Sequence, residues 1–174
     1  MPAAEPLRTL RPLSELDYYD CRSLPIPAGL SALEAWNLMT AHPGGLMRLA
    51  VKVRDAISAR FGVQRIGGFS GHRRDAVQAG DRLDFFLVEH SAPDLLILTE
   101  RDRHLDVMIC VSTGDHLLAV TASVVTHNVF GRIYMLPVGP VHRLIVASYL
   151  RRLKQHLEEA PSGVPGGASE SSGS

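Results

Sequence analysis

Between residues 81 and 127 apolar and polar side chains alternate with a period of two, and this pattern constrains the fold more than any other. It divides into four candidate strands, 81–90, 94–100, 103–111 and 117–127. The segments between them are short and contain Pro, Asp or Gly, which are turn residues. Because short connections join antiparallel neighbours, the pattern predicts an antiparallel meander.

The two faces of this meander differ in polarity. Neighbouring strands agree on an apolar face if the turns lie at 91–94, 101–102 and 113–116. That face carries Leu83, Phe85, Leu87, Leu96, Leu98, Leu105, Val107, Ile109, Val111, Leu118, Val120, Ala122 and Val124. The other face is mixed, with Asp84, Phe86, Ile97, Thr99, His104, Asp106, Met108, Thr121, Ser123 and His127. We expect helices to cover the apolar face.

The segment before the meander predicts one strand and two helices. A short edge strand over 18–26 ends at two prolines. Ser31 and Glu34 form a capping-box pattern that begins a helix over 31–40. Apolar residues at helical spacing predict a second helix over 46–61.

The segment after the meander predicts a helix broken by proline. A short helix is expected over 129–135, and the segment from Pro137 to Pro140 then kinks or interrupts it. A long last helix follows over 141–159. The fold class is therefore α+β.

Composition bounds the domain and its compartment. Residues 1–16 are rich in proline and predict a loose arm, and 160–174 lack the apolar residues of a core and predict a disordered tail. One domain over 17–159 remains. Lys plus Arg and Asp plus Glu are both 18, which gives no electrostatic case for nucleic acid. With no signal-like or membrane-spanning apolar run, we expect a cytoplasmic protein without a membrane partner.

The mixed face holds the densest group of chemically active side chains. Asp102, His104, Asp106, Ser123 and His127 converge in this register. Two His and two Asp side chains suit acid–base chemistry, and Arg132 nearby could stabilise an anion. The alternative interpretation is a solvated outer face. No metal-binding spacing such as HExxH is present, so we expect no metal and no cofactor.

The apolar side predicts a different site. His142 lies on the stripe of the last helix that also carries Val146, Tyr149 and Leu153. It is either a core histidine with a satisfied hydrogen bond or a ligand contact in a cavity. The residues expected to line such a cavity are Trp36, Phe85, Leu105, Val107, Val120 and His142.

Several motifs carry a family resemblance. Asp81-Arg-Leu-Asp-Phe-Phe, Asp102-Arg-His-Leu-Asp, Thr126-His-Asn-Val-Phe-Gly-Arg-Ile-Tyr and Pro140-Val-His-Arg-Leu-Ile resemble the bacterial family catalogued as domain of unknown function 2867. The resemblance covers roughly residues 17–153. It implies a fold similar to the START-like (SRPBCC) helix-grip superfamily: a curved antiparallel sheet, two short helices after the first strand, and a long C-terminal helix across the sheet. Many members of that superfamily hold an apolar ligand, and some members of the family are fused to nicotinamide-binding domains.

Three functional hypotheses follow. The first is a domain that binds a small apolar or amphipathic molecule between the sheet and the last helix. The second is an enzyme in which His104, Asp106 and His127 supply acid–base groups. The third is an interaction module, either a homodimer through an exposed patch of Phe86, Ile97 and Met108 or an accessory to a nicotinamide-dependent partner.

Overall fold

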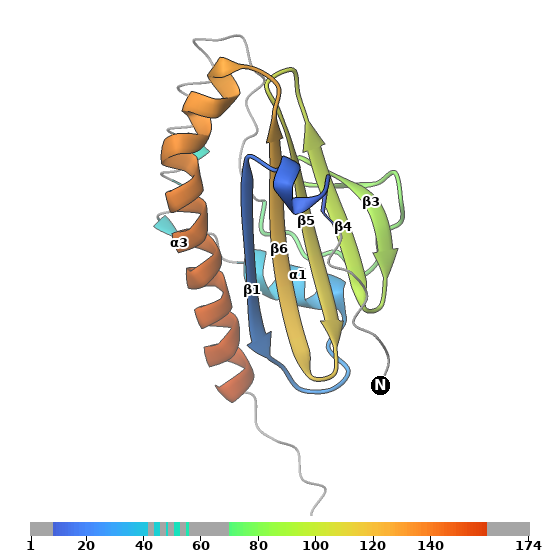
Figure 1. Ribbon diagram of the computed structural model, residues 1–174. Helices are drawn as coiled ribbons and strands as arrows, with labels where there is room; N and C mark the ends of the chain where they lie inside the picture. Colours follow the sequence, from blue (N-terminus) through green and yellow to red (C-terminus); the bar gives the residue numbers. More distant parts are fainter. Residues whose placement is uncertain are drawn as a thin grey trace, which may run out of the picture.

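The computed structural model describes residues 9–41, 44–45, 48, 51–52, 55 and 70–159. Six antiparallel strands form one sheet in the order β1-β6-β5-β4-β3-β2 (Figure 1). Their bounds are β1 Tyr18–Pro25, β2 Arg82–Leu83, β3 Phe86–Ala92, β4 Leu95–Arg101, β5 Leu105–Gly114 and β6 Leu117–Thr126. The helices are the 3₁₀ turn η1 Leu13–Glu15, α1 Ala32–Thr40 and α3 Val129–Glu159. The fold is thus the predicted α+β arrangement of meander and long C-terminal helix.

Two predicted segments lie wholly or largely outside the described residues. Most of the expected second helix over 46–61 is one, and the expected tail over 160–174 is the other. The first short helix is confirmed together with its cap. Ser31 Oγ accepts a hydrogen bond from the Glu34 backbone N–H, and the Glu34 side chain accepts one from the Ser31 backbone N–H.

The β4–β5 and β5–β6 pairings differ from the predicted register by an even number of residues, whereas the β3–β4 pairing has a bulge between Val88 and His90. Arg101 pairs with Asp106, so four residues rather than two separate the paired residues of β4 and β5 at this turn. Asp102 Oδ1 holds this wider loop by accepting from the backbone N–H of His104 and Leu105. Met108 lies opposite Ser123, where Asp106 was predicted. Because side chains alternate with a period of two, an even shift leaves every residue of β4, β5 and β6 on its predicted face.

The face assignment was wrong in the first predicted strand. The segment 81–90 is not one strand, because the chain reverses between Leu83 and Phe86 and forms the β2–β3 hairpin. Asp84 adopts a left-handed conformation with φ 55° in this turn. Together with the bulge between Val88 and His90, this turn directs Phe86 and Val88 toward the core, and Phe85 and Leu87 do not occupy their predicted positions there.

The predicted break at Pro137 and Pro140 was also wrong. α3 continues through both prolines from Val129 to Glu159. A proline in a helix removes the hydrogen bond to the carbonyl four residues earlier, here those of Ile133 and Leu136. Both of these residues are exposed, so water can reach the two carbonyls. The helix therefore tolerates the prolines on this side.

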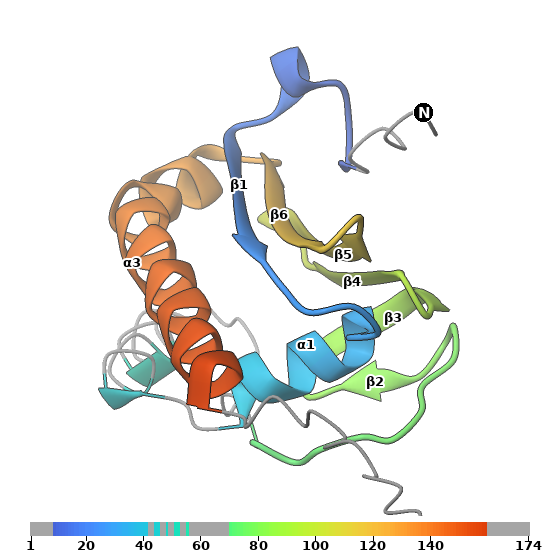
Figure 2. The ribbon, with the colours of Figure 1, turned by 90° about the horizontal axis from the view of Figure 1, so that it is seen from below.

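The main core lies between one face of the sheet and the helices α1 and α3 (Figure 2). It joins side chains from the sheet, such as Leu98 and Val111, to Trp36 of α1 and Leu153 of α3. The inward alternation of apolar residues in the strands and the apolar stripe of α3 account for this layer.

The opposite face of the sheet is more buried than its mixed sequence predicts. Leu95, Ile97, Met108 and Cys110 form a second apolar cluster, and Leu10 packs on it from the segment before β1. The Leu10 backbone N–H donates to Ser123 Oγ at 3.2 Å. The proposed homodimer patch is therefore corrected, because Phe86, Ile97 and Met108 are all at most 6 % exposed within one chain.

Candidate functional site

α3 carries two polar side chains on the face that it turns toward the sheet. We define this inner face by His142, Ile145, Val146, Tyr149 and Leu153, which recur at helical spacing. His142 and Tyr149 are seven residues apart and lie on the same side, about 10 Å from each other along the helix axis. All the other members are apolar, so these two side chains determine what the inner face can recognise.

His142 contacts Tyr18 at the junction between α3 and β1. The Tyr18 hydroxyl lies 3.2 Å from His142 Nδ1 and donates to the Gly139 carbonyl oxygen at 3.3 Å. The two rings meet edge to face, with 5.7 Å between their centroids. A Cβ at residue 139 would lie 3.2 Å from the Tyr18 ring, which is closer than ordinary contact. Glycine at this position therefore allows the close approach of α3 to β1.

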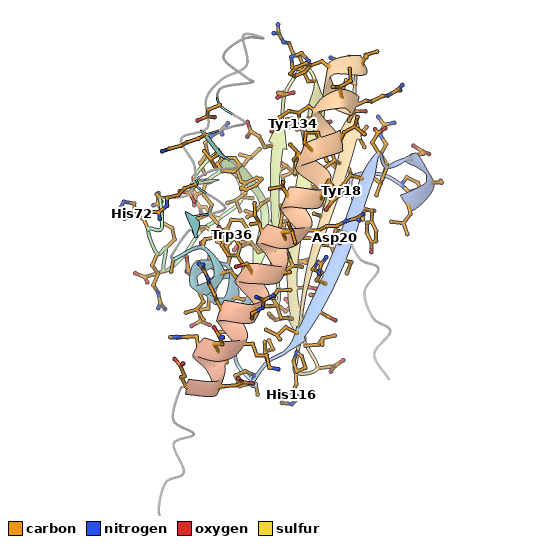
Figure 3. All side chains as sticks on the ribbon, turned by 90° about the vertical axis from the view of Figure 1, so that its left-hand side faces the viewer. Tyr18, Asp20, Trp36, His72, His116 and Tyr134 are labelled. Atoms are coloured by element: carbon orange, nitrogen blue, oxygen red, sulfur yellow. The ribbon has the colours of Figure 1, made fainter. Side chains whose placement is uncertain are left out.

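Charged groups from β1 and α3 surround the contact between Tyr18 and His142. Tyr18, Asp20 and Arg22 alternate along β1 and so point to one face of the sheet. Arg22 Nε donates to Asp20 Oδ2 at 2.9 Å, and Arg143 Nε lies 3.8 Å from Asp20 Oδ1. The Arg143 guanidinium also stands 5.5 Å from the centroid of the Tyr18 ring. Figure 3 shows Tyr18 and Asp20 beside α3.

Burial keeps both partners of the contact in their neutral forms. It lowers the pKa of His142, and the charge of Asp20 opposes this effect. It raises the pKa of Tyr18, and Asp20 adds to this increase. With the Tyr18 proton directed to the Gly139 carbonyl, His142 Nδ1–H donates to the Tyr18 oxygen, and His142 Nε2 is then an acceptor. The junction offers neutral hydrogen-bonding groups rather than a charge.

Tyr149 is the unusual member of the inner face. Its hydroxyl is buried and has no hydrogen-bond partner among the described residues. Burial raises the pKa of Tyr149 to about 12, so it remains a neutral donor. An unsatisfied buried polar group costs about 1–3 kcal/mol. A hydroxyl left in this state in an apolar cluster is a group that a bound molecule can satisfy.

The predicted cavity-lining residues are only partly brought together. Trp36 and Val120 are buried in the main core, and Phe85 and Val107 pack against its edge. The Trp36 ring meets the Phe86 ring edge to face at 5.9 Å. Leu105, at the first position of β5, is half-buried, and His142 contacts Tyr18.

The predicted acid–base group is divided into two pairs. His127 Nε2 lies 3.0 Å from Asp106 Oδ1, and both side chains are partly exposed. His104 instead faces Asn128, with Nδ1 3.0 Å from the Asn128 amide nitrogen. Arg132 is exposed in the first turn of α3, and its backbone N–H donates to the Asn128 carbonyl oxygen at 3.2 Å.

His104 and Asn128 stabilise the start of α3. Asn128 Oδ1 accepts from the Gly131 backbone N–H, and Asn128 Nδ2 donates to the Arg103 carbonyl. The Gly131 backbone packs directly on the His104 carbonyl, where a Cβ would overlap it. The Phe130 ring lies 4.6 Å from the His104 ring. These contacts fix the corner where β6 passes into α3.

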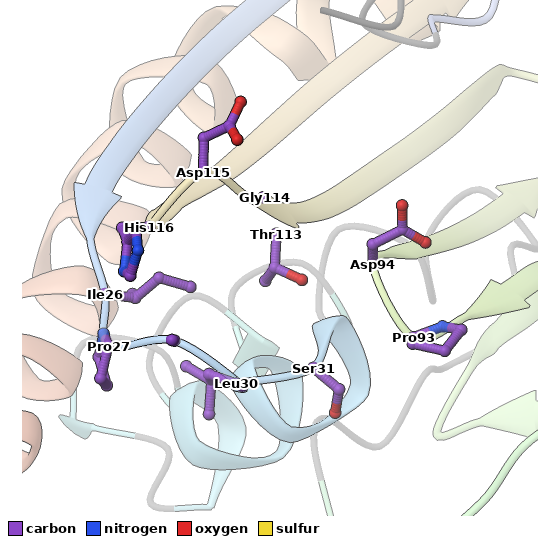
Figure 4. Close-up of a pocket in the computed structure, with 12 residues that line it drawn as sticks. Ile26, Pro27, Leu30, Ser31, Pro93, Asp94, Thr113, Gly114, Asp115 and His116 are labelled. Atoms are coloured by element: carbon purple, nitrogen blue, oxygen red, sulfur yellow. The ribbon is translucent and has the colours of Figure 1, made fainter. Parts of the chain in front are cut away.

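A separate pocket of about 430 Å³ opens at the hairpin end of the sheet (Figure 4). Its lining comes from the loop after β1 and from the two hairpin turns: Ile26, Pro27, Ala28, Gly29, Leu30, Ser31, Pro93, Asp94, Thr113, Gly114, Asp115 and His116. Asp115 and His116 both have positive φ, as a tight two-residue turn requires. The backbone here is paired, for example Ile26 N–H to the His116 carbonyl at 2.9 Å. Among its lining residues, none carries a buried side-chain polar atom without a hydrogen-bond partner.

Sequence reasoning missed most of the junction. Tyr18, Asp20, Arg22, Gly139 and Arg143 were not predicted as site residues. The alternation along 18–26 predicts that Tyr18, Asp20 and Arg22 share one face of their strand. No sequence signal shows that this strand lies beside α3. Within the described residues, no group of three or more His, Cys, Asp or Glu side chains is placed to hold a metal ion.

Comparison with known proteins gives one match. A family model described as "Protein of unknown function (DUF2867)" matches residues 12–149. No curated protein and no solved structure matches the chain. The matched segment includes β1, the whole meander and the inner face of α3 as far as Tyr149.

Proposed function

The chain belongs to the DUF2867 family, and from its site we propose that it binds a small, mainly apolar molecule that carries a hydrogen-bond acceptor. The molecule would lie between the sheet and the inner face of α3. This arrangement resembles the way START-like helix-grip proteins hold ligands, and it refines the expectation from the sequence. Such a site must bury the apolar part of the molecule and donate one hydrogen bond to its acceptor.

The unpaired hydroxyl of Tyr149 is the observation that carries this proposal. It is part of a side chain that is 8 % exposed and packs among Val146, Leu150 and Leu153. A phenol there makes packing no better than phenylalanine would and adds a polar group that must be satisfied. A ligand carbonyl, ether or hydroxyl oxygen would accept its proton.

The Tyr18–His142 junction supplies a second polar point for the same molecule. It lies two turns nearer the start of α3, about 10 Å from Tyr149 along the axis. His142 can accept a hydrogen bond through Nε2, and the Asp20, Arg22 and Arg143 charges lie just outside. An amphipathic molecule with its polar end at the junction and an oxygen at Tyr149 fits this pattern.

The test is a binding measurement on the full chain. Native mass spectrometry of the purified protein detects any molecule that has co-purified, and calorimetry with medium-chain alcohols and ketones measures affinity. We expect Tyr149→Phe to weaken binding of the oxygen-bearing probes roughly tenfold, the loss of one hydrogen bond. The matched variant Tyr134→Phe, a half-buried tyrosine of α3, should bind like the original chain.

Absence of binding would overturn the proposal. The result must come from protein whose circular dichroism and unfolding are those of a folded chain. Equal affinity of the original chain and Tyr149→Phe would remove Tyr149 from the site.

The Asp106–His127 pair supports a second candidate, an enzyme. A carboxylate that holds one nitrogen of an imidazole orients it for proton transfer. The 3.0 Å separation at the partly exposed end of β5 and β6 has this geometry. Hydrolysis of simple aryl esters by the original chain, lost in His127→Gln and kept in His104→Gln, would favour the enzyme. No turnover by the original chain would count against it.

A further inference from the structure

The outer face of α3, on the side away from the sheet, is apolar over its first half. We define the outer stripe by Val129, Ile133, Leu136, Pro140 and Leu144, which follow one another at spacings of three or four residues. Its four large side chains are between 59 % and 73 % exposed. Figure 3 looks onto this side of the helix. Scattered exposed apolar residues are ordinary, but a continuous row along four helical turns is not.

The same face becomes cationic over its second half. Arg151 and Lys154 continue the line of the outer stripe at helical spacing, and both are exposed. α3 has five Arg and Lys residues and no Asp or Glu before Glu158. The chain as a whole has zero formal net charge, so positive charge is gathered on this helix.

The positive charge on this face distinguishes between the surfaces that could cover it. α3 is long and apolar enough to cross a membrane by composition, with 28 % of its most apolar window buried. However, its inner face packs on β1, β6 and α1, so the helix lies along the sheet as part of the domain. A second copy of the chain packed through this face would offer Arg151 and Lys154 no acidic side chain of α3 before Glu158. Exposed apolar side chains continuous with cations instead match the surface of an anionic bilayer.

We propose that the outer face of α3 docks on membranes that contain anionic lipid. The helix lies in the plane of the interface. The stripe from Val129 to Leu144 enters the boundary between headgroups and acyl chains, and Arg151 and Lys154 contact lipid phosphates. Tyr134, half-buried on the first half of the helix, is a residue type that favours this boundary. The inner face with its site stays turned toward the sheet, so docking is independent of the proposed ligand binding.

Co-sedimentation of the full chain with vesicles tests this. One vesicle preparation contains phosphatidylcholine alone, and the other contains phosphatidylcholine with phosphatidylglycerol. We expect binding to the second preparation, weakened by salt, and weak binding to the first. The triple variant Ile133→Gln, Leu136→Gln, Leu144→Gln should lower the partition coefficient roughly tenfold or more. Arg151→Gln with Lys154→Gln should reduce binding to the anionic vesicles only.

The control variant carries glutamine at exposed leucines elsewhere. Leu13 and Leu117 are 61 % and 44 % exposed and lie outside α3. Leu13→Gln with Leu117→Gln should sediment with anionic vesicles like the original chain. No sedimentation of the original chain, or equal binding by the triple variant, would overturn the proposal. A dimer of the original chain that the triple variant converts to a monomer, by light scattering, would also overturn it, because a second copy would then cover this face.

Discussion

The two faces of α3 are both apolar, yet they differ in what they leave unsatisfied. The inner face buries its side chains on the sheet and α1, and its Tyr149 hydroxyl has no hydrogen-bond partner among the residues that the structure describes. The outer face leaves whole side chains exposed, from Val129 to Leu144. A helix that only covered a sheet would be polar along its outer side. We infer that α3 has a task on each side, with recognition of a small molecule inside and of a surface outside.

The largest expected difference between the faces is in packing energy. Leu153→Ala on the inner face removes a side chain that is 2 % exposed in the core, and we expect a loss of about 3 kcal/mol. Leu136→Ala on the outer face removes one that is 73 % exposed, and the change should stay within about 0.5 kcal/mol. Urea unfolding followed by circular dichroism measures both. Similar losses for the two variants would show that the outer stripe is packed in solution.

Alkaline pH should affect the inner face through Tyr149. Its pKa is raised to about 12 in the folded chain, against 10.0 when unfolded. As the pH rises past 10, the unfolded state ionises first, so this contribution is intact below pH 10 and is lost toward pH 12. A shift of this size corresponds to about 3 kcal/mol at most. Between neutral pH and about pH 11, the free energy of unfolding of the original chain should therefore fall progressively relative to that of Tyr149→Phe. Parallel curves for the two proteins would exclude a buried neutral phenol.

The junction of the inner face with β1 should be sensitive to a single methyl group. In Gly139→Ala the new Cβ lies 3.2 Å from Tyr18, so the ring or the helix must move. We expect a loss of about 1–2 kcal/mol and altered NMR signals of His142. Gly114→Ala is the matched control, because a Cβ there meets nothing within 4 Å. Equal stability of both variants would mean that α3 does not approach β1 this closely.

The smallest effect is expected at acid pH. Burial lowers the pKa of His142 from its ordinary 6.5, so the folded state resists protonation there. The stabilisation from neutral His142 is full above pH 6.5 and is lost as the pH falls below it. The charge of Asp20 makes the pKa shift smaller. Between neutral pH and about pH 5, His142→Gln should lose less stability than the original chain. The exposed His72→Gln serves as control, and equal losses in all three proteins would place His142 in water.

The sequence predicts the meander well because its signal is local. Short turns and alternating side chains give both the antiparallel order and the correct faces of β4, β5 and β6. The faces survive a wrong register because the errors, two and four residues, are even. No comparable sequence signal marks the left-handed conformation of Asp84, because aspartate is common in several other kinds of turn. The reversal at this residue and the bulge between Val88 and His90 together change which residues of β3 face the core.

The site is less predictable because it joins distant segments. His142 was placed correctly on the apolar stripe of the last helix, but its partner Tyr18 is 124 residues away in sequence. Strand order in a sheet decides that contact, and the pairing of β1 with β6 follows from the whole fold rather than from either strand. The pair Asp106 and His127 was found by sequence because both lie on neighbouring strands near one turn.

The position of β1 beside β6 has a consequence for how the chain reaches its folded state. β2 to β6 are linked in series by short hairpins and can form soon after they are synthesised, whereas β1 is made first and must wait for a strand about a hundred residues later. Such long-range closure is slow, because the entropy of a large loop is lost before its contacts form. The Tyr18–His142 junction also needs α3, which comes last along the chain. We expect the proposed binding site to be the last part of the domain to assemble, so a molecule that binds there should affect the final phase of refolding alone.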